Sequence, residues 1–313
     1  MDLPSLDPVM FWLCLALFPL ILLYLNRAYQ KWQTGGETLP IPPPTKIAEI
    51  RIYPIKSCRG FRVDKATILK SGLDLDRQWM FVDAGKGNFV TIRQVSKMTL
   101  IDTAITANDE LAVSIRNSSP LIRFTIPARP SKEWLKKNTT LADVEIWGTK
   151  LDGYMYPEEL TAPFSKFLDR DVRLVYKGPK VRTLRGNGDP KILGRTESMK
   201  FADLMPLQIS NQKSIEELNG RLSQIGHEAI TIERFRPNIV VEGESPWYED
   251  TWKTVKIDGK VKSIISDVVA RCARCQVPNV DPETAVKDKN QPFVPLVDFN
   301  FAPLLTLETD GTC

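Results

Sequence analysis

Two cysteines, Cys272 and Cys275, lie three positions apart in the segment RCARCQVPNVDP. Arg271 and Arg274 stand next to the two thiols, and a neighbouring cation lowers the pKa of a thiol and favours the thiolate. A thiolate can act as a nucleophile or bind a soft metal ion. The same spacing also occurs in zinc half-sites, in redox-active dithiols and in cysteines that only pack. The pair is therefore the first candidate for chemistry, with these roles open.

The rest of the sequence weighs against two of those roles. A structural zinc ion needs four ligands of Cys, His or carboxylate type. Outside the apolar N-terminal run, only Cys58, Cys313 and the single histidine, His227, are left to complete a Cys and His set. A thioredoxin-like dithiol lies at the N-terminus of a helix, whereas Pro278 discourages a helix that begins at Cys275. A zinc or redox module stays an alternative at this point.

Further polar candidates stand at the ends of extended segments. In YPIKSC, Lys56 and Ser57 follow a predicted strand and could hold a phosphate through ammonium, hydroxyl and amide groups. In FRPN, Arg236 and Asn238 alternate around a proline and can point to one face, where they could bind an anion or a planar heterocycle. Arg77 in LDLDRQW is a further cation of this kind. Taken singly, each also fits a surface or ion-paired side chain.

The composition limits the kinds of protein that this chain can be. Of the 313 residues, 42% are hydrophobic and 26% are charged, which is typical of a folded globular chain. The 42 Lys and Arg residues exceed the 38 Asp and Glu residues by only four, so the charge gives no argument for a nucleic-acid partner. The five cysteines are an odd and sparse set, which indicates a reducing compartment rather than a disulfide framework.

The N-terminus carries an uncharged apolar run, VMFWLCLALFPLILLYL, over residues 9–25. Its length reaches the short limit for a membrane-spanning helix. Acidic residues precede the run and basic residues follow it, which does not fit a signal peptide and places the following chain in the cytosol. We therefore expect an uncleaved membrane anchor over residues 1–29 and a Pro- and Gly-rich linker over residues 30–45. The alternative is an apolar helix buried in the globule.

The chain after the linker has mostly the pattern of strands. β-branched runs predict strands, and the Gly-rich stretch 84–88 predicts the turn of a hairpin. Asp258-Gly259 predicts the two-residue turn of a second hairpin. The predicted strands and hairpins cover residues 47–53, 78–94, 238–243 and 254–264.

Helices are fewer. The capping box Ser214-x-x-Glu217 predicts the start of one helix, and residues 158–170 predict another despite Pro163. The sequence therefore predicts an α+β, mainly β fold in which residues 46–175 and 176–313 form two domains.

Six motifs, taken together and in order, resemble those of a known family. YPIKSC, DRQW, FADxxP, RFRPNIVVEG, YEDTW and RCxRCxVPNVDPET are similar to motifs of MOSC-domain proteins, in particular of the mitochondrial amidoxime-reducing component type. The resemblance covers about residues 46–290. It implies an N-terminal anchor and two β-barrel-like domains. The chain stops soon after the VDP segment, so we expect the second barrel to be shortened.

The resemblance implies a molybdenum–molybdopterin cofactor held between the two domains. By position, Cys275 matches the thiolate that binds molybdenum, and Ala273 and Arg274 match the cofactor-contacting residues before it. The other matching cofactor positions are Lys56, Ser57, Arg77, Arg236 and Asn238.

The implied activity is the reduction of N-hydroxylated compounds such as amidoximes and hydroxylamines. Electrons would come from NADH through a flavin reductase and a b-type cytochrome, and the implied membrane is the mitochondrial outer membrane, or else the endoplasmic reticulum. Asp203 in FADLMP would assist proton traffic; by itself it fits a turn residue. Relatives carry small hydroxyl residues after this aspartate, whereas Leu204 and Met205 leave only backbone contacts here. The alternative is a degenerate or non-catalytic MOSC protein that binds a molybdenum cofactor or pyridoxal phosphate.

Overall fold

The computed structural model describes residues 17–27, 29, 43–271, 276–289, 291 and 292, together with the backbone of residues 303–308. The predicted site residues Ala273, Arg274 and Cys275 lie outside the described residues, and so does Cys272. The chain divides into two compact units, Met1–Pro44 and Thr45–Cys313.

In the first unit, residues 17–27 are helical. Within the described part of the chain, no helix has both the length and the apolar character needed to cross a bilayer. The first half of the predicted anchor run, residues 9–16, lies outside the described residues.

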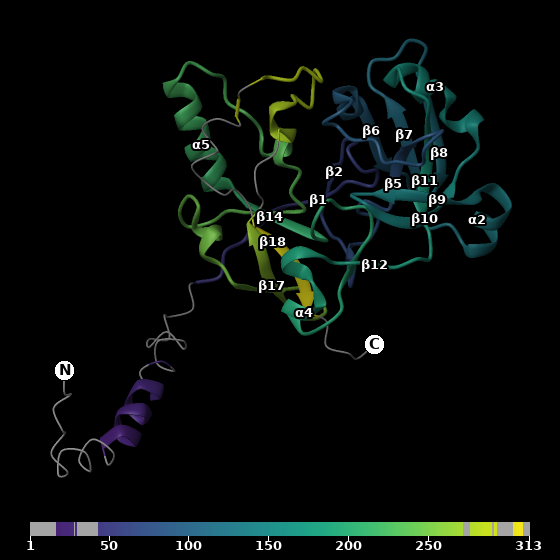
Figure 1. Ribbon diagram of the computed structural model, residues 1–313. Coiled ribbons are helices and arrows are strands. Elements are labelled where there is room, and N and C mark those ends of the chain that lie inside the picture. Colours follow the sequence, from purple (N-terminus) through teal and green to yellow (C-terminus); the bar gives the residue numbers. More distant parts are fainter. Residues whose placement is uncertain are drawn as a thin grey trace, which may run out of the picture. The chain divides into compact units, whose positions relative to one another are not determined.

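A seven-stranded sheet organises the second unit, in the order β16-β17-β18-β14-β15-β1-β2 (Figure 1). Strands β14 and β15 are parallel, and all other neighbours are antiparallel. Strands from early and late parts of the chain meet here, so the two predicted domains share one sheet. The strands are β1 (Ile47–Ile52), β2 (Phe61–Val63), β14 (Leu207–Asn211), β15 (Ile239–Val241), β16 (Thr254–Asp258), β17 (Ser263–Arg271) and β18 (Pro303–Glu308).

Two smaller sheets form the other side of this unit (Figure 1). One has the order β5-β11-β10-β9, and the other has the order β6-β7-β8. Their strands are β5 (Trp79–Asp83), β6 (Ile101–Ile105), β7 (Glu110–Ile115), β8 (Arg123–Pro127), β9 (Thr140–Ile146), β10 (Thr149–Met155) and β11 (Val172–Lys177). Two short pairs complete the set: β3 (Ile68–Leu69) with β4 (Gly72–Leu73), and β12 (Arg182–Thr183) with β13 (Ser198–Met199).

Helices connect and cover these sheets. Helix α5 provides the connection that the parallel pair β14 and β15 requires. The α-helices are α2 (Lys132–Asn138), α3 (Glu158–Leu168), α4 (Pro190–Leu193) and α5 (Gln212–Gln224). The 3-10 helices are η1 (Ser96–Leu100), η2 (Gly186–Gly188), η3 (Ile232–Phe235), η4 (Tyr248–Thr251) and η5 (Val277–Asn279).

The mainly β character with some helices is confirmed, but a closed barrel is not found. Each sheet of the described residues has two edge strands in its hydrogen-bonded order. In the seven-stranded sheet, the edge strands β2 and β16 do not pair with each other, so its hydrogen-bonded order stays open.

Several predicted elements are confirmed, and three details are wrong. β1, β5, β15 and α3 form where they were predicted. Residues 89–94 make only isolated bridges, because the chain turns after Val90 and the backbone N–H of Gln94 donates to Thr91 O at 2.9 Å. The β16–β17 hairpin forms, but its last pair is Asp258 with Ser263, so its loop has four residues and not two.

The third wrong detail is the start of α5. Asn211 caps this helix, because its side chain accepts from Lys213 N at 2.8 Å. Ser214 instead lies within the helix and is buried, and its hydroxyl donates to Glu249 at 2.6 Å.

Strand β5 explains how the core positions the site. Trp79 and Phe81 pack into the main core, whereas Met80 and Val82 pack into a second cluster. Because both faces of β5 are covered, its sequence is a continuous apolar run rather than an alternation. The buried strand then anchors the chain at Lys56, whose backbone N–H donates to Trp79 O at 2.8 Å.

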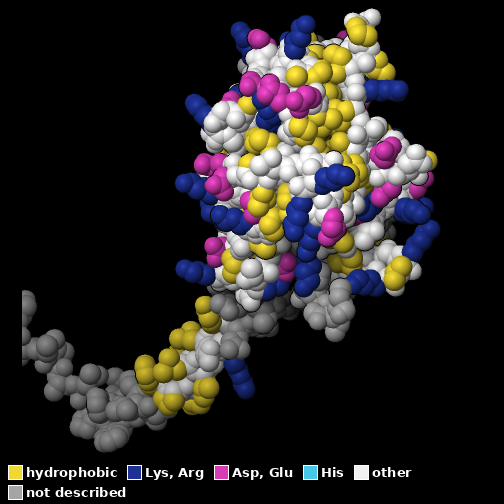
Figure 2. All heavy atoms as spheres, turned by 90° about the vertical axis from the view of Figure 1, so that its right-hand side faces the viewer, with side chains coloured by type: hydrophobic (Ala, Val, Ile, Leu, Met, Phe, Trp, Pro, Cys, Tyr) yellow, Lys and Arg dark blue, Asp and Glu magenta, His cyan; other side chains and the backbone are white. Residues whose placement is uncertain are grey.

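The surface carries both signs of charge close together. On the face that Figure 2 shows, Lys and Arg side chains are interspersed with Asp and Glu side chains. Exposed ion pairs such as Arg129 with Asp74, at 2.7 Å, are part of this pattern. Charges of both signs are thus intermixed on this face.

Candidate functional site

A cavity of about 320 Å³ in the second unit collects every predicted site residue that the structure describes. These six residues come from four separate segments, and all of them line the cavity: Lys56, Ser57, Arg77, Asp203, Arg236 and Asn238. The remaining lining residues are Ile92, Arg93, Trp147, Ala202, Leu204, Met205, Gln208, Arg234, Phe235, Val277 and Pro278.

Lys56 and Ser57 lie in the turn after β1. The Lys56 side chain is only 4% exposed, its Nζ donates to Phe201 O at 3.0 Å, and it forms an ion pair with Asp203. Burial lowers the pKa of Lys56 to about 8, although the charge and hydrogen bond of Asp203 act in the opposite direction. Ser57 has a positive φ of 68°. Within the described residues, its hydroxyl has no hydrogen-bond partner and is free to bind a ligand.

Asp203 lies between two cations and an indole. Besides Lys56, Arg93 Nη2 lies 3.5 Å from Asp203 Oδ2, and Trp147 Nε1 donates to Asp203 Oδ1 at 2.9 Å. Burial raises the pKa of Asp203, but the charges of Lys56 and Arg93 and these hydrogen bonds outweigh it and hold the pKa below its usual value. The side chain is 42% exposed to the cavity, so solvent weakens these charges without removing them. Near neutral pH, Asp203 is therefore a carboxylate.

Two guanidinium groups make cation–π contacts with one aromatic ring. Arg77 Cζ and Arg236 Cζ each lie 4.4 Å from the centroid of the buried Tyr53 ring. Arg77 also pairs with Asp76 at 2.6 Å, and Arg236 Nη2 donates to Cys58 O at 2.6 Å. Burial lowers the pKa of Arg236, and the like charge of Arg77 adds to this effect. Arginine still stays protonated at neutral pH, so the ring holds two cations at the cavity.

The side-chain amide of Asn238 is occupied by hydrogen bonds within the fold. Its side chain is 1% exposed, its Nδ2 donates to Arg51 O at 3.2 Å, and its Oδ1 accepts from Gln208 N at 3.3 Å. The amide thus joins β1 to the start of β14. The predicted contact between Asn238 and a cofactor stays a prediction.

Arg182 supports the segment that carries Asp203. This buried side chain donates to the carbonyl oxygens of Lys200 and Ala202 and to Asp203 O. Burial lowers the pKa of Arg182 to about 10, while Asp203 acts against this shift. Sequence reasoning missed Arg182, because no local pattern shows that its side chain is buried under the segment around residue 203.

The lining residues that sequence reasoning missed include Arg93, Trp147 and Arg234. Arg93 was placed in a strand, and the turn after Val90 brings it to the cavity instead. Trp147 and Gly148 form the tight turn between β9 and β10. The glycine was a signal for that turn, but tryptophan is not a usual turn residue.

The segment after the two cysteines borders the cavity. Val277 and Pro278 line it, and strand β17 ends at Arg271, just before the cysteine pair. Arg234 holds this segment, because its guanidinium donates to Pro278 O at 3.3 Å and to Asp281 at 2.6 Å. Asp281 Oδ1 in turn accepts from the backbone N–H groups of Glu283 and Thr284 at 2.8 and 2.9 Å.

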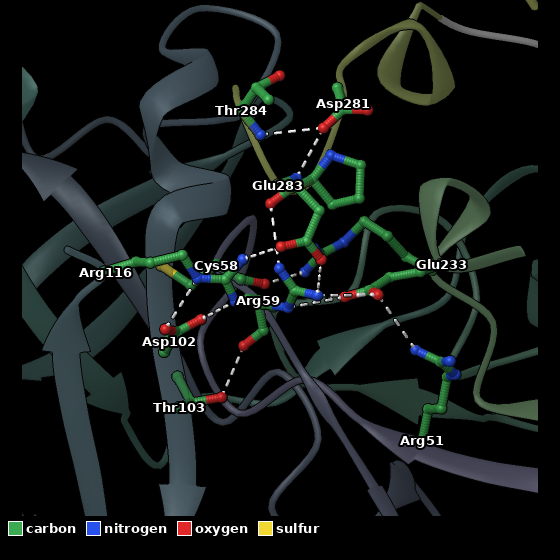
Figure 3. Close-up of polar contacts among 12 residues, drawn as sticks. Arg51, Cys58, Arg59, Asp102, Thr103, Arg116, Glu233, Asp281, Glu283 and Thr284 are labelled. Carbon is green, nitrogen blue, oxygen red and sulfur yellow. Dashed lines mark hydrogen bonds and ion pairs between the residues drawn. The ribbon is translucent and has the colours of Figure 1, made fainter. Parts of the chain in front are cut away.

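Arg59 connects residues 276–289 to other parts of the second unit through ion pairs (Figure 3). It pairs with Glu233 at 3.1 Å and also with Glu283. Glu283 is shared with Arg116, which pairs with Asp102 at 2.7 Å. The segment 276–289 is therefore held at the cavity by a cluster of ion pairs.

The donor set fits an anionic ligand. Five cations, with one carboxylate among them, line the cavity: Lys56, Arg77, Arg93, Arg234 and Arg236, with Asp203. Apolar side chains such as Ile92 and Met205 add surface for a planar ring. These groups fit a phosphate-bearing heterocycle such as molybdopterin.

Cys58 packs in the main core and does not line the cavity. It is fully buried, and burial raises the pKa of its thiol, with Arg236 acting weakly against this shift. In the absence of a metal ion, Cys58 is therefore a neutral thiol at neutral pH.

Comparisons with known proteins match two domains and several relatives. Residues 45–171 match the MOSC N-terminal beta barrel domain, and residues 196–299 match the MOSC domain. The chain is 30% identical over 260 residues to mitochondrial amidoxime-reducing component 1 of Mus musculus, covering 81% of this chain and 71% of that protein. It is likewise 30% identical over 259 residues to component 2 of Bos taurus, with the same coverage.

A third relative has a different name. Over 286 residues the chain is 30% identical to molybdenum cofactor sulfurase of Arabidopsis thaliana, covering 86% of this chain but 34% of that protein. Both domain matches and the coverage of the first two relatives agree on one assignment. The chain belongs to the family of MOSC-domain proteins that includes the mitochondrial amidoxime-reducing components.

Proposed function

We propose that the cavity holds a molybdenum–molybdopterin cofactor and that the chain reduces N-hydroxylated compounds such as amidoximes and hydroxylamines. One observation carries the proposal: six predicted site residues from four segments converge on one cation-lined cavity beside Val277 and Pro278. The names of the amidoxime-reducing relatives support the same reaction class.

The described residues suit distinct parts of such a cofactor. Lys56, Ser57, Arg77 and Arg236 would hold the phosphate and the pterin through charge and hydrogen bonds. We propose Cys275 as the thiolate ligand of molybdenum, with Ala273 and Arg274 as its flanking contacts. When bound, the metal centre would supply the two-electron chemistry.

The reaction also needs protons. Reducing N–OH to N–H takes two electrons and two protons and releases one water. Lys56 holds a proton on Nζ at neutral pH, because its pKa is about 8. Asp203 Oδ1 accepts hydrogen bonds from Lys56 and Trp147. In the proposed reaction, Lys56 is thus the proton-bearing member of this pair, and Asp203 orients it.

We further propose the setting of the reaction. Electrons would arrive from NADH through a flavin reductase and a b-type cytochrome. The apolar run at residues 9–25 would anchor the chain with its second unit in the cytosol, and the mitochondrial relatives favour the outer mitochondrial membrane over the endoplasmic reticulum.

The experiment is to measure the metal and pterin content of the purified chain and its reduction of benzamidoxime with the cytochrome and reductase present. We expect molybdenum and pterin in equal amounts. Cys275→Ala should abolish reduction, because the metal loses its protein ligand. The matched control, Cys272→Ala, should keep most activity. Bound zinc that both variants lose, with no molybdenum in the unchanged chain, would refute the proposal in favour of a zinc half-site.

The similarity to the sulfurase favours a second candidate, a MOSC protein that binds the cofactor without reducing N-hydroxylated compounds. The same measurements separate the two candidates. Stoichiometric molybdenum and pterin without any benzamidoxime reduction would support the second.

A further inference from the structure

Trp147 occupies a backbone conformation that does not suit its side chain. It has a φ of 49°, and Gly148 after it has a φ of 71°. The two residues form the turn between β9 and β10, where Ile146 pairs with Thr149. Glycine and asparagine are the usual residues in this left-handed region, and a bulky side chain there is an outlier. Such strain points to a functional constraint at this position.

The strain is not explained by burial of the indole. Trp147 stays 47% exposed. Its ring is nevertheless held from several sides: the Phe89 ring centroid lies 4.8 Å away, Arg93 Cζ lies 5.3 Å from the ring centroid, and Nε1 donates to Asp203 Oδ1 at 2.9 Å. The result is an exposed aromatic surface in a fixed position at the cavity.

The side chains that line the cavity differ in their exposed fraction. The buried ones form its floor, and the exposed ones form its rim. Lys56, Ser57 and Asn238 have exposures of 4, 8 and 1%, so they form a polar floor. Trp147 at 47% and Leu204 at 55% form the apolar part of an exposed rim, beside Asp203 at 42%. Asp203 connects the two parts, because it pairs with Lys56 and accepts from Trp147. A molecule that enters the cavity meets the rim before it reaches the floor.

We propose that Trp147, together with Leu204, selects N-hydroxylated substrates that carry an aromatic or other planar apolar group. The group would pack against the exposed indole, which is already ordered and so loses little freedom on binding. The N–OH group would then face the polar interior. The inference rests on the proposed function for the reaction, but the residue and the substrate class follow from the strained, exposed ring.

Two probes isolate the contribution of the ring. Benzamidoxime and acetamidoxime share the reacting group and differ in an aromatic versus a methyl substituent. For Trp147→Ala, we expect KM and the equilibrium dissociation constant for benzamidoxime to rise about tenfold. The equilibrium dissociation constant for acetamidoxime, which lacks a ring to pack on the indole, should change less than about twofold. Trp147→Phe should restore most of the benzamidoxime affinity, because it keeps a ring and loses only the hydrogen bond to Asp203.

A stability measurement separates specificity from a structural role. Asparagine tolerates the left-handed conformation, so Trp147→Asn should keep or raise the melting temperature of the holoprotein while it weakens benzamidoxime binding as Trp147→Ala does. A clear fall in melting temperature would mean that the indole stabilises the fold. Equal losses for both amidoximes would mean that the ring does not select the substituent. Either result would overturn the inference.

The two proposals also fail in different ways. If the unchanged holoprotein reduces neither amidoxime, the proposed function fails, and the dissociation constants still decide the role of Trp147. Absence of measurable benzamidoxime binding to the unchanged protein would overturn the inference itself.

Discussion

Two walls of the cavity are built by different interactions. The wall formed by the turn after β1 and the FRPN segment is held by buried hydrogen bonds, such as those of Asn238 with Arg51 and Gln208. The wall formed by residues 276–289 also buries side chains such as Val280, but it is joined to other segments by ion pairs at partly exposed positions, with Arg59 at their centre (Figure 3).

The difference predicts two kinds of behaviour. Buried hydrogen bonds are costly to break, because an unpaired polar group away from water loses its solvation. Ion pairs open to solvent are weaker and are screened by salt. The first wall should therefore unfold only with the whole unit, whereas the wall next to the cysteine pair should loosen separately, most easily at high ionic strength.

The largest effect should come from breaking the first wall. Asn238→Ala leaves the carbonyl of Arg51 and the amide of Gln208 without their side-chain partner, and should lower the free energy of unfolding by about 3 kcal/mol. Urea unfolding provides the measurement. The control is Asn187→Ala, which removes an exposed hydrogen bond to Val269 O and should cost less than about 1 kcal/mol. Similar losses in the two variants would contradict the assignment of the first wall as the stronger one.

A smaller effect should come from the second wall. Arg59, 17% exposed, bridges Glu233 and Glu283, and Arg59→Gln should cost about 2 kcal/mol and speed proteolysis within residues 276–289. Arg129→Gln is a matched control, because Arg129 also bridges two carboxylates, Asp74 and Asp109, but is 51% exposed.

The control should change stability by less than about 1 kcal/mol and leave the proteolysis rate unchanged. In the unchanged protein, added salt should speed the same cleavage. Cleavage that is insensitive both to salt and to Arg59→Gln would show that ion pairs do not hold this wall.

The smallest effect should come from the aromatic ring behind the two arginines. In the described part of the chain, the buried hydroxyl of Tyr53 has no hydrogen-bond partner, so Tyr53→Phe should cost nothing and could add up to about 1 kcal/mol of stability. The matched change Tyr156→Phe removes the acceptor of Trp79 Nε1 and should cost about 1 to 2 kcal/mol. A loss of stability in Tyr53→Phe as large as in Tyr156→Phe would show that the Tyr53 hydroxyl does have a partner.

Much of the site was predictable because its residues stand in short motifs. Lys56 and Ser57 follow a β-branched strand, and Arg236 and Asn238 flank a proline. Taken singly, these contexts also fit surface or ion-paired side chains, and only the six motifs in order selected these residues. The structure brings these residues together with Asp203 and Arg77 at one cavity. The barrel-like domains were not predictable in detail, because closure depends on strand lengths and edges that only the assembled sheets reveal.

The sequence by itself determined which residue types are available and where the segments with the clearest local pattern, β1, β5, β15 and α3, form strands or a helix, since these follow from local periodicity and turn chemistry. Only the tertiary structure decided that Lys56 meets the segment of Phe201, 145 positions away, and that Arg93, Trp147 and Arg234 join the site. It also decided that the Asn238 amide is used by the fold and that the pKa of Lys56 falls to about 8. The physical reason is that burial and distance depend on how remote segments pack, and no local pattern records them.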